Sequence, residues 1–296
     1  MKEFIRSIIV ILALCITILT LTIAYFFNTD IETKEPERVI EECEIQTYTY
    51  MERKVFTITQ KNIDEAGNFK YIVYFHGGSY MAEATQNHWD FLEQLVKDTG
   101  YTVIMPDYPL TPKNTYKEVY AMVEPLYKEI IEKVGNDNVI FMGDSAGGAL
   151  ALGLYEKIAE GNMGLPAKTI LISPWLDVRL ENENIQAVEK NDTVLNKEAL
   201  RIAGIAYAGV DGIDSYLVNP IEGDLTTLKN IKIWIGTYDI LEPDCQLLQE
   251  KAKEVGGDVE IKEYEQAKHI WLIDKNSDDT ITEKAYQDLL EELRKN

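Results

Sequence analysis

Histidine and cysteine are scarce in this chain of 296 residues, which contains only three of each. None of them falls into a cluster with the spacing of a zinc site. The sequence also lacks a glycine-rich loop followed by Lys-Ser or Lys-Thr, the pattern that holds nucleotide phosphates, and Asp278-Asp279 lacks the frame of a calcium loop. The residues therefore imply no cofactor and no metal.

Positive charge is also in short supply. Lysine and arginine total 29 against 50 aspartate and glutamate residues, which gives a formal net charge of −21. A chain this acidic repels nucleic acid and has no polybasic patch for anionic lipid headgroups. We therefore expect no nucleic-acid partner, whereas the oligomeric state is left open.

The longest hydrophobic run lies at the N-terminus, where residues 7–27 carry no charge. At about 1.5 Å per helical residue, such a run can cross a hydrocarbon core about 30 Å thick. It is longer than the roughly 7–15 residues of a signal-peptide core, and it ends in Tyr25-Phe26-Phe27 rather than at a small-residue cleavage site. We therefore expect residues 1–27 to be an uncleaved transmembrane anchor, with a cleaved signal peptide as the alternative.

The charges on the two sides of this run predict its orientation. Lys2 and Arg6 precede it, and a row of acidic residues follows it: Asp30, Glu32, Glu35, Glu37, Glu41, Glu42 and Glu44. The positive-inside rule keeps the N-terminus in the cytoplasm and puts the rest of the chain outside the cell membrane. A disulfide between Cys43 and Cys245 is compatible with that oxidising exterior, although nothing in the sequence brings the two together.

The rest of the chain reads as a tether and one large domain. Residues 28–44 are charged and poor in apolar residues, whereas residues 45–296 suit a single fold. Strand-like runs recur at 45–50, 54–59, 70–75, 101–106, 138–143, 169–173, 231–236 and 259–264, and helix-like runs at 88–99, 114–134, 146–160, 243–255 and 280–294. This order predicts an α/β fold whose mostly parallel eight-stranded sheet has helices on both faces. Residues 178–216 interrupt the alternation, so we expect them to form a small helical cap.

The pentapeptide Gly143-Asp144-Ser145-Ala146-Gly147 has the form G-x-S-x-G. An apolar, β-prone run precedes it and a run of small, helix-compatible residues follows it. A strand, a sharp turn and a helix hold a serine with its hydroxyl exposed, and the glycines leave room for close backbone approach. The sequence therefore predicts that Ser145 is a nucleophile.

A serine hydroxyl needs a base, and the base needs an orienting acid. The order serine, acid, histidine is typical of this arrangement, and only His269 of the three histidines follows Ser145. Asp239 comes soon after the strand at 231–236 and is our candidate acid. Glu242 and Asp244 are rivals that suit the first turn of the next helix.

A predicted strand at 71–75 leads directly into His76-Gly77-Gly78-Ser79. Two adjacent glycines let backbone N–H groups turn toward a developing oxyanion. We expect Gly77 and Gly78, together with Ala146 after the nucleophile, to form an oxyanion hole.

These motifs resemble those of the α/β-hydrolase esterases related to hormone-sensitive lipase. His76-Gly77-Gly78 matches the H-G-G-G run of that family, with Ser79 in place of the last glycine, and 143–148 matches its G-D-S-A-G-G. Residues 107–112 resemble D-Y-R-L-A-P, and 236–241 resemble G-x-x-D-x-L, in which the aspartate is the triad acid. His269-Ile270-Trp271 stands where the family usually has H-G-F, and the resemblance spans roughly residues 45 to 295.

The resemblance implies a serine carboxylesterase that hydrolyses short-chain acyl or acetyl esters of small molecules through an acyl-enzyme, with no cofactor. Ser79, Trp175, Tyr207 and Trp271 are candidate substrate contacts, and the Trp271 indole is expected to narrow the space beside the base. The triad alone does not separate an esterase from a serine peptidase or amidase. An inactive hydrolase fold used as a binding surface is a further alternative.

Overall fold

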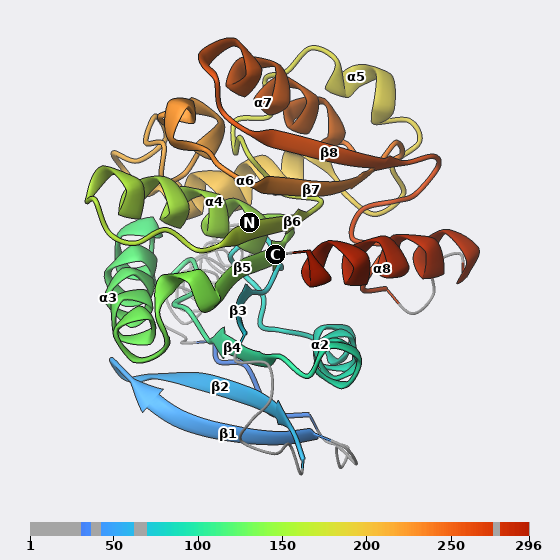
Figure 1. The fold of residues 1–296 in the computed structure, drawn as a ribbon. Coiled ribbons are helices and arrows are strands. Elements are labelled where there is room, and N and C mark those ends of the chain that lie inside the picture. Colours follow the sequence, from blue (N-terminus) through green and yellow to red (C-terminus); the bar gives the residue numbers. More distant parts are fainter. Residues whose placement is uncertain (1–30, 37–42, 62–69, 275–278, 296) are drawn as a thin grey trace, which may run out of the picture.

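The structure is a computed structural model that describes residues 31–36, 43–61, 70–274 and 279–295. Its centre is one eight-stranded sheet in the order β1-β2-β4-β3-β5-β6-β7-β8 (Figure 1). The strands are β1 (Cys43–Tyr50), β2 (Arg53–Gln60), β3 (Tyr71–Phe75), β4 (Thr102–Pro106), β5 (Val139–Asp144), β6 (Lys168–Ile172), β7 (Ile231–Gly236) and β8 (Val259–Tyr264). The β1–β2 and β2–β4 pairs are antiparallel and the other five are parallel. The mostly parallel eight-stranded sheet expected from the sequence is therefore confirmed.

Helices cover both faces of the sheet, as expected. One face carries α2 (Gln86–Thr99) and α8 (Asp279–Arg294), and the other carries α3 (Tyr116–Val134), α4 (Ser145–Glu160) and α7 (Glu242–Val255) (Figure 1). Helices α2 and α3 each begin with a capping box. At α3, for example, the Glu118 carboxylate accepts the N–H of Thr115 at 2.8 Å, which satisfies a donor that the helix itself cannot pair.

Alternate residues of the central strands pack into two separate hydrophobic cores, one on each face of the sheet. In β3, Ile72 and Tyr74 pack under α2 and α8, whereas Val73 and Phe75 pack under α3 and α4. Successive side chains of a strand point to opposite faces of the sheet, so a strand whose two faces are both covered contributes to both cores. Strands buried on both sides read as continuous apolar runs, which is why they were visible in the sequence.

Strands β3 to β8 all end at the same edge of the sheet, which we call the carboxyl edge. In open α/β sheets ligands bind outside this edge. The β6–β7 connection crosses it and contains α5 (Ile185–Val188), α6 (Lys197–Ala208) and two short 3₁₀ turns, η2 (Pro220–Glu222) and η3 (Leu225–Thr227). The residues expected to form a cap, 178–216, thus include α5 and α6.

The N-terminal segment 31–36 is docked on this domain, whereas residues 28–44 were expected to be a free tether. Thr33 is fully buried, and its N–H donates to the Asp107 carboxylate at 2.9 Å. Its hydroxyl accepts the N–H of Ala84 at 3.3 Å. Arg53 forms a buried ion pair with Asp107 at 2.9 Å and also donates to the Ile31 carbonyl at 2.9 Å. The unpaired donors and acceptors of a short polar segment explain why it adheres here.

Two sequence expectations concern the N-terminal run and the cysteines. The expected span at 7–27 lies outside the described residues, and among the helices of the described residues none is long and apolar enough to cross a bilayer. Cys43 and Cys245 are both buried and form no disulfide with each other. They belong to the cores on opposite faces of the sheet, so they do not pair.

Candidate active site

Ser145 occupies the turn between β5 and α4. Its φ is +51°, in the left-handed region that costs a non-glycine residue roughly 1–3 kcal/mol. A Cβ at Gly143 would lie 2.7 Å from the Phe75 carbonyl oxygen, and a Cβ at Gly147 would collide with the carbonyl oxygens of Phe75 and His76. Glycine at both positions therefore lets α4 begin directly against β3 and holds Ser145 at the carboxyl edge.

The three residues expected to form a triad lie within hydrogen-bond distance of one another. The Ser145 hydroxyl is 3.0 Å from Nε2 of His269, and Nδ1 of His269 is 2.9 Å from the Asp239 carboxylate. His269 follows β8 and Asp239 follows β7, so two strand ends deliver them to the same point. All three side chains are buried. This is the geometry in which a histidine can take a proton from a serine.

The two rival carboxylates contact no histidine within the described residues. Glu242 and Asp244 lie in the first turn of α7, where negative charge suits the helix dipole. Asp244 accepts a hydrogen bond from Asn182 at 3.0 Å, and burial raises the pKa of its carboxyl to about 6. Their position fits a role in the helix rather than at the histidine.

Two opposing effects act on the pKa of His269. Burial on its own would lower it, because the charged ring loses water. The charge and the hydrogen bond of Asp239, together with the charges of Asp192 and Asp144, outweigh burial, and the pKa of His269 is raised above its ordinary value. The ring is therefore a stronger base than a free histidine.

We expect this shift to appear in the pH dependence of ester hydrolysis. Only neutral His269 can accept the serine proton, so kcat/KM should fall about tenfold per pH unit below its pKa. Because the pKa is raised, the midpoint of this acid limb should lie above about 6.5, the value of a free histidine. A pH–rate profile on a soluble ester measures it. A midpoint below pH 6 would contradict the assignment of His269 as the base.

The oxyanion hole differs from the expectation in one residue. The N–H of Gly77 is not available, because it donates to the Asp144 carboxylate at 2.9 Å. Within the described residues, no protein acceptor takes the N–H groups of Gly78, Ser79 or Ala146. Gly78 has a φ of +117° and Ser79 a φ of +54°, which turns this loop sharply at the carboxyl edge. The geometry therefore favours Gly78, Ser79 and Ala146 as the oxyanion donors, in place of Gly77.

Asp144, next to the nucleophile, connects the elbow to this loop. Its buried carboxylate accepts from the Tyr74 hydroxyl at 2.7 Å, from Gly77 N–H and from Nε2 of His88 at 3.4 Å. A Cβ at Gly77 would collide with the same carboxylate, which is why that position is glycine. This role of Asp144 was not predicted, although its position inside the G-D-S-A-G motif was a signal.

Asp192, in the expected cap, is a second residue at the site that was not predicted from the sequence. Its carboxylate accepts the N–H of Ile240, directly after the acid, at 3.0 Å. Its charge also contributes to the raised pKa of His269. The cap thus holds the loop that carries Asp239. Nothing in the local sequence of Asp192 indicated this contact.

An aromatic stack stands beside the nucleophile. Trp175 donates its backbone N–H to the Ser145 carbonyl at 3.0 Å, which places it next to the elbow. Its ring stacks near Tyr80 at 5.8 Å between centroids, and Tyr80 stacks on Tyr207 of α6 at 3.5 Å with an angle of 3°. Two of the candidate pocket residues, Trp175 and Tyr207, therefore meet around Tyr80, which follows Ser79 in the oxyanion loop.

Trp271 lies elsewhere. It packs 5.2 Å from Tyr264, between ring centroids, in the core under α2 and α8, whereas the stack belongs to the core on the other face. The backbone turns at Ile270, which has a φ of +47°, and this turn carries the indole away from the aromatic stack. The expectation that Trp271 narrows the space beside Ser145 is therefore not supported by its packing.

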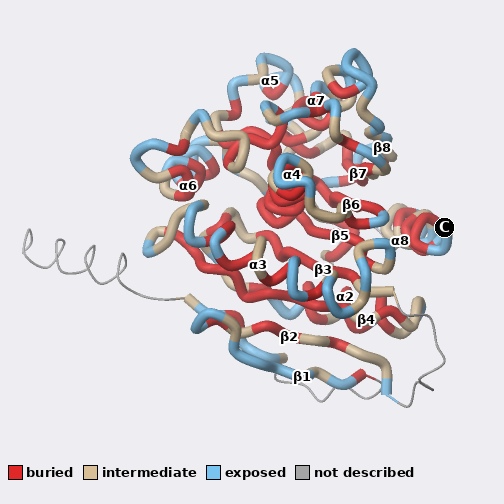
Figure 2. The backbone as a smooth tube through the Cα atoms, turned by 60° about the vertical axis from the view of Figure 1, so that its left-hand side comes forward, coloured by how far each residue is buried: buried red, intermediate tan, exposed pale blue. Residues whose placement is uncertain are grey.

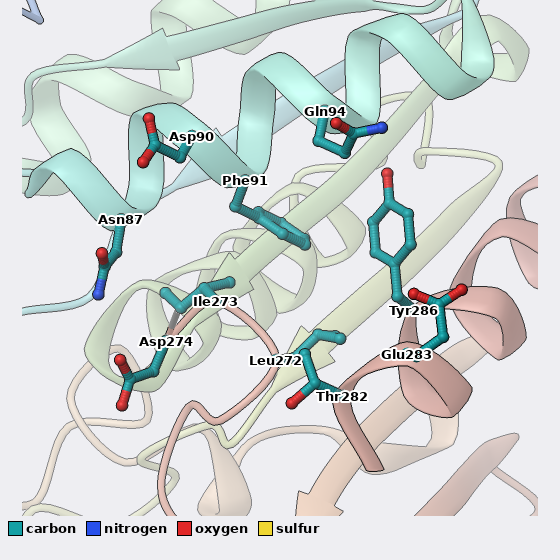
Figure 3. Close-up of a pocket in the computed structure, with 10 residues that line it drawn as sticks. All are labelled: Asn87, Asp90, Phe91, Gln94, Leu272, Ile273, Asp274, Thr282, Glu283 and Tyr286. Atoms are coloured by element: carbon teal, nitrogen blue, oxygen red, sulfur yellow. The ribbon is translucent and has the colours of Figure 1, made fainter. Parts of the chain in front are cut away.

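A cavity of about 290 Å³ opens between α2, α8 and the loop after His269 (Figure 3). Phe91, Leu272 and Ile273 form its apolar part, and Asp90, Asp274 and Glu283 lie at its rim. None of its lining residues belongs to the triad or the oxyanion loop. Within the described residues, no three His, Cys, Asp or Glu side chains gather closely enough to hold a metal ion.

Comparisons with known proteins agree with this architecture. A sequence profile described as alpha/beta hydrolase fold matches residues 72–273. An esterase of Acinetobacter venetianus is 30% identical over 203 residues, which is 68% of this chain and 67% of the relative. An acetyl-hydrolase of Streptomyces hygroscopicus is 28% identical over 202 residues, with the same coverage of 68% and 67%. The crystal structure of a hormone-sensitive lipase from a metagenome library superposes with a TM-score of 0.78 at 23% identity, covering 93% of this chain and 95% of that one.

Proposed function

Because this chain belongs to the alpha/beta hydrolase fold family, in the group of esterases similar to hormone-sensitive lipase, we propose that it is a carboxylesterase with Ser145 as nucleophile. The observation that carries the proposal is the hydrogen-bonded chain from Ser145 through His269 to Asp239 at 3.0 and 2.9 Å. The substrate is a small-molecule ester, and the acetyl-hydrolase and esterase relatives support that class.

In the first half-reaction, the Ser145 hydroxyl oxygen attacks the ester carbonyl carbon while Nε2 of His269 takes its proton. The carbonyl oxygen becomes an oxyanion and accepts hydrogen bonds from the N–H groups of Gly78, Ser79 and Ala146. Each such donor is worth about 2.7–4 kcal/mol in the transition state. Asp239 keeps the Nδ1 proton of His269 in place and stabilises the imidazolium. His269 then protonates the leaving alcohol as the ester C–O bond breaks.

In the second half-reaction, water takes the place of the alcohol. His269 removes a proton from the water, whose oxygen attacks the acyl carbon of the Ser145 ester through the same oxyanion. The carbonyl reforms, the serine oxygen leaves with the proton from His269, and the carboxylic acid departs. The same residues thus act twice, and no further group is needed.

The aromatic stack supports a preference for short acyl groups. Trp175 is bonded to the Ser145 carbonyl, and its ring, Tyr80 and Tyr207 are buried in one stack, so bulky rings rather than small side chains stand on this side of the elbow. Apolar pockets discriminate by about 1–3 kcal/mol per methylene, so the preference should be graded.

We expect p-nitrophenyl acetate and butyrate to be cleaved far better than decanoate, and Tyr207→Ala to raise the decanoate-to-acetate ratio of kcat/KM by tenfold or more. Removing the phenol opens space beside Tyr80 that added methylenes can fill. Tyr286→Ala, on the opposite face of the sheet, is the matched control and should leave the ratio unchanged. A wild-type optimum at long chains would point to a lipase, and efficient cleavage of matched anilides would point to an amidase.

The proposal includes a membrane anchor, which rests on the uncharged run at 7–27 and on Lys2 and Arg6 before it. The protein would then cross the membrane once, and the hydrolase domain would lie outside the cell. Protease added to intact protoplasts should digest the domain and spare the anchor. A protected domain, or a mature N-terminus near residue 28, would refute this topology.

A further inference from the structure

We infer that the carboxyl edge of this protein rests on the surface of the bilayer that holds its N-terminal anchor, so that the active site takes esters dissolved in that bilayer. The inference builds on the proposed anchor and on the proposed esterase function. It adds an interaction surface and a substrate class: amphiphilic esters with a short acyl group and an apolar alcohol.

The first observation is where the described chain begins. Ile31 and Thr33 are held by Arg53 and Asp107, and Asp107 directly follows β4 at the carboxyl edge. Thr33 also binds Ala84, a few residues beyond the oxyanion loop. The chain therefore leaves the domain at the edge that carries the active site, rather than at the opposite edge.

The second observation is the length of chain between this point and the hydrophobic run. Only Asn28, Thr29 and Asp30 separate Phe27 from Ile31. Four residue steps span at most about 14 Å, even when fully extended. A bilayer that holds residues 7–27 therefore lies within this distance of the docked segment, and the carboxyl edge is brought close to it.

The third observation is the distribution of exposed apolar side chains. Eight large ones are exposed among the described residues, and six of them lie on two elements at the carboxyl edge, the β1–β2 hairpin tip and the cap. We call these six the apolar rim: Tyr48, Met51, Val194, Ile202, Ile205 and Val210. The remaining two, Leu247 and Val255, lie on α7.

The hairpin tip lies beside the docked segment, and the cap lies on the same side of the molecule. The hairpin tip precedes Arg53, which is bonded to Asp107. A Cβ placed on Gly209, next to Val210, would lie 3.0 Å from Thr115 at the N-cap of α3, so this end of the cap packs against the segment that follows β4. Figure 2 shows α6 and the start of the described chain on the same side of the molecule. Val210 is 98% exposed and Ile202 is 68% exposed, which is costly in water but favourable at a lipid interface.

Charge decides which lipid surface suits this contact. The chain has a formal charge of −21, so an anionic surface repels it, and the rim attracts it only through apolar contact. We therefore expect the apolar rim to bind a zwitterionic bilayer of phosphatidylcholine. With the cap against the bilayer, an ester enters from the lipid side and presents its acyl end to Ser145.

The test uses the full chain in phosphatidylcholine vesicles with the domain outside. An environment-sensitive fluorophore is attached to Ile205→Cys or, as the matched control, to Val255→Cys near the end of α7, with Cys15→Ser in both; Cys43 and Cys245 are buried. Lipids with a nitroxide headgroup should quench the label at 205 several-fold more than the label at 255. Equal quenching at both positions would overturn the orientation. Self-quenching at 205 that depends on protein density would show a second copy on the rim instead and would also overturn it.

Hydrolysis rates on a membrane-dissolved ester and on a soluble ester give an independent test. Ile202→Ser with Ile205→Ser should lower hydrolysis of hexadecyl acetate in vesicles by fivefold or more and leave soluble p-nitrophenyl acetate unchanged, whereas Val255→Ser should change neither. Equal rates on hexadecyl acetate would refute the inference. Two further results would refute the underlying proposals instead. If the protein does not co-float with vesicles, the anchor is refuted, and if it does not hydrolyse p-nitrophenyl acetate, the esterase function is refuted. The label at 205 should be quenched equally in a Ser145→Ala background.

Discussion

Replacing Ser145 with alanine should reduce ester hydrolysis by about four orders of magnitude or more. Without the Oγ no acyl-enzyme forms, and the remaining groups can only assist the direct attack of water. The fold should survive, since alanine fits where serine fits and the elbow depends on Gly143 and Gly147 rather than on the hydroxyl. Initial rates on p-nitrophenyl acetate, with circular dichroism to check folding, measure the effect.

A fluorophosphonate probe supplies the control, because it reacts only with an activated serine. It should label the wild type at Ser145, and labelling should disappear in Ser145→Ala. Retention of more than about one hundredth of the wild-type rate, or labelling at another serine, would end the assignment of the nucleophile. An unlabelled but folded wild type would favour the inactive hydrolase fold.

Replacing Asp239 with asparagine should lower kcat by about 10⁴, although the side chain keeps its shape. One carboxylate oxygen, Oδ1, accepts the N–H of Leu241 at 3.0 Å, and the other, Oδ2, faces Nδ1 of His269 at 2.9 Å. The single oxygen of asparagine satisfies Leu241, which leaves the NH₂ group facing the histidine. Nδ1 must then accept, so the proton moves to Nε2 and the ring can no longer take the serine proton.

The neighbouring carboxylates are matched controls for this change. Glu242→Gln and Asp244→Asn should each alter kcat by less than about tenfold, because neither side chain contacts His269 within the described residues. If one of them cripples the enzyme while Asp239→Asn is mild, the acid has been misassigned. The pH–rate profile of Asp239→Asn should also shift its acid limb to lower pH, because the charge that raises the pKa of His269 is gone.

Sequence patterns were enough to predict the sheet and to pick out Ser145, Asp239 and His269, which the structure places within hydrogen-bond distance of one another. All eight strands lie within two residues of their expected ends. The central strands are buried and mostly apolar, whereas the edge strands β1 and β8 are mostly exposed or half-buried and alternate apolar with polar residues. Ser145 was visible because glycine is required on both sides of it by close backbone approach to β3, and the resulting G-x-S-x-G pattern is contiguous in the sequence. His269 followed from chain order, since only one histidine comes after the serine.

Contacts between distant segments could not be predicted in this way. The H-G-G pattern does not say which N–H faces the substrate, and Gly77 was excluded only by a hydrogen bond to Asp144, 67 residues away. Tyr80 and Tyr207 meet through the cap, and Thr33 reaches Asp107 across 74 residues. Trp271 follows His269 by two residues in the sequence, but it packs against Tyr264 in the core on the other face of the sheet from the aromatic stack.

The buried Asp144 carboxylate makes the nucleophile and the oxyanion loop one rigid body. It is bonded to Tyr74 of β3 and to Gly77 of the loop, and it precedes Ser145 in the chain. In the proposed mechanism, the N–H dipoles of this loop would be held in place before a substrate arrives. Such preorganisation is the property that separates an enzyme site from solvent water, whose dipoles must turn during the reaction.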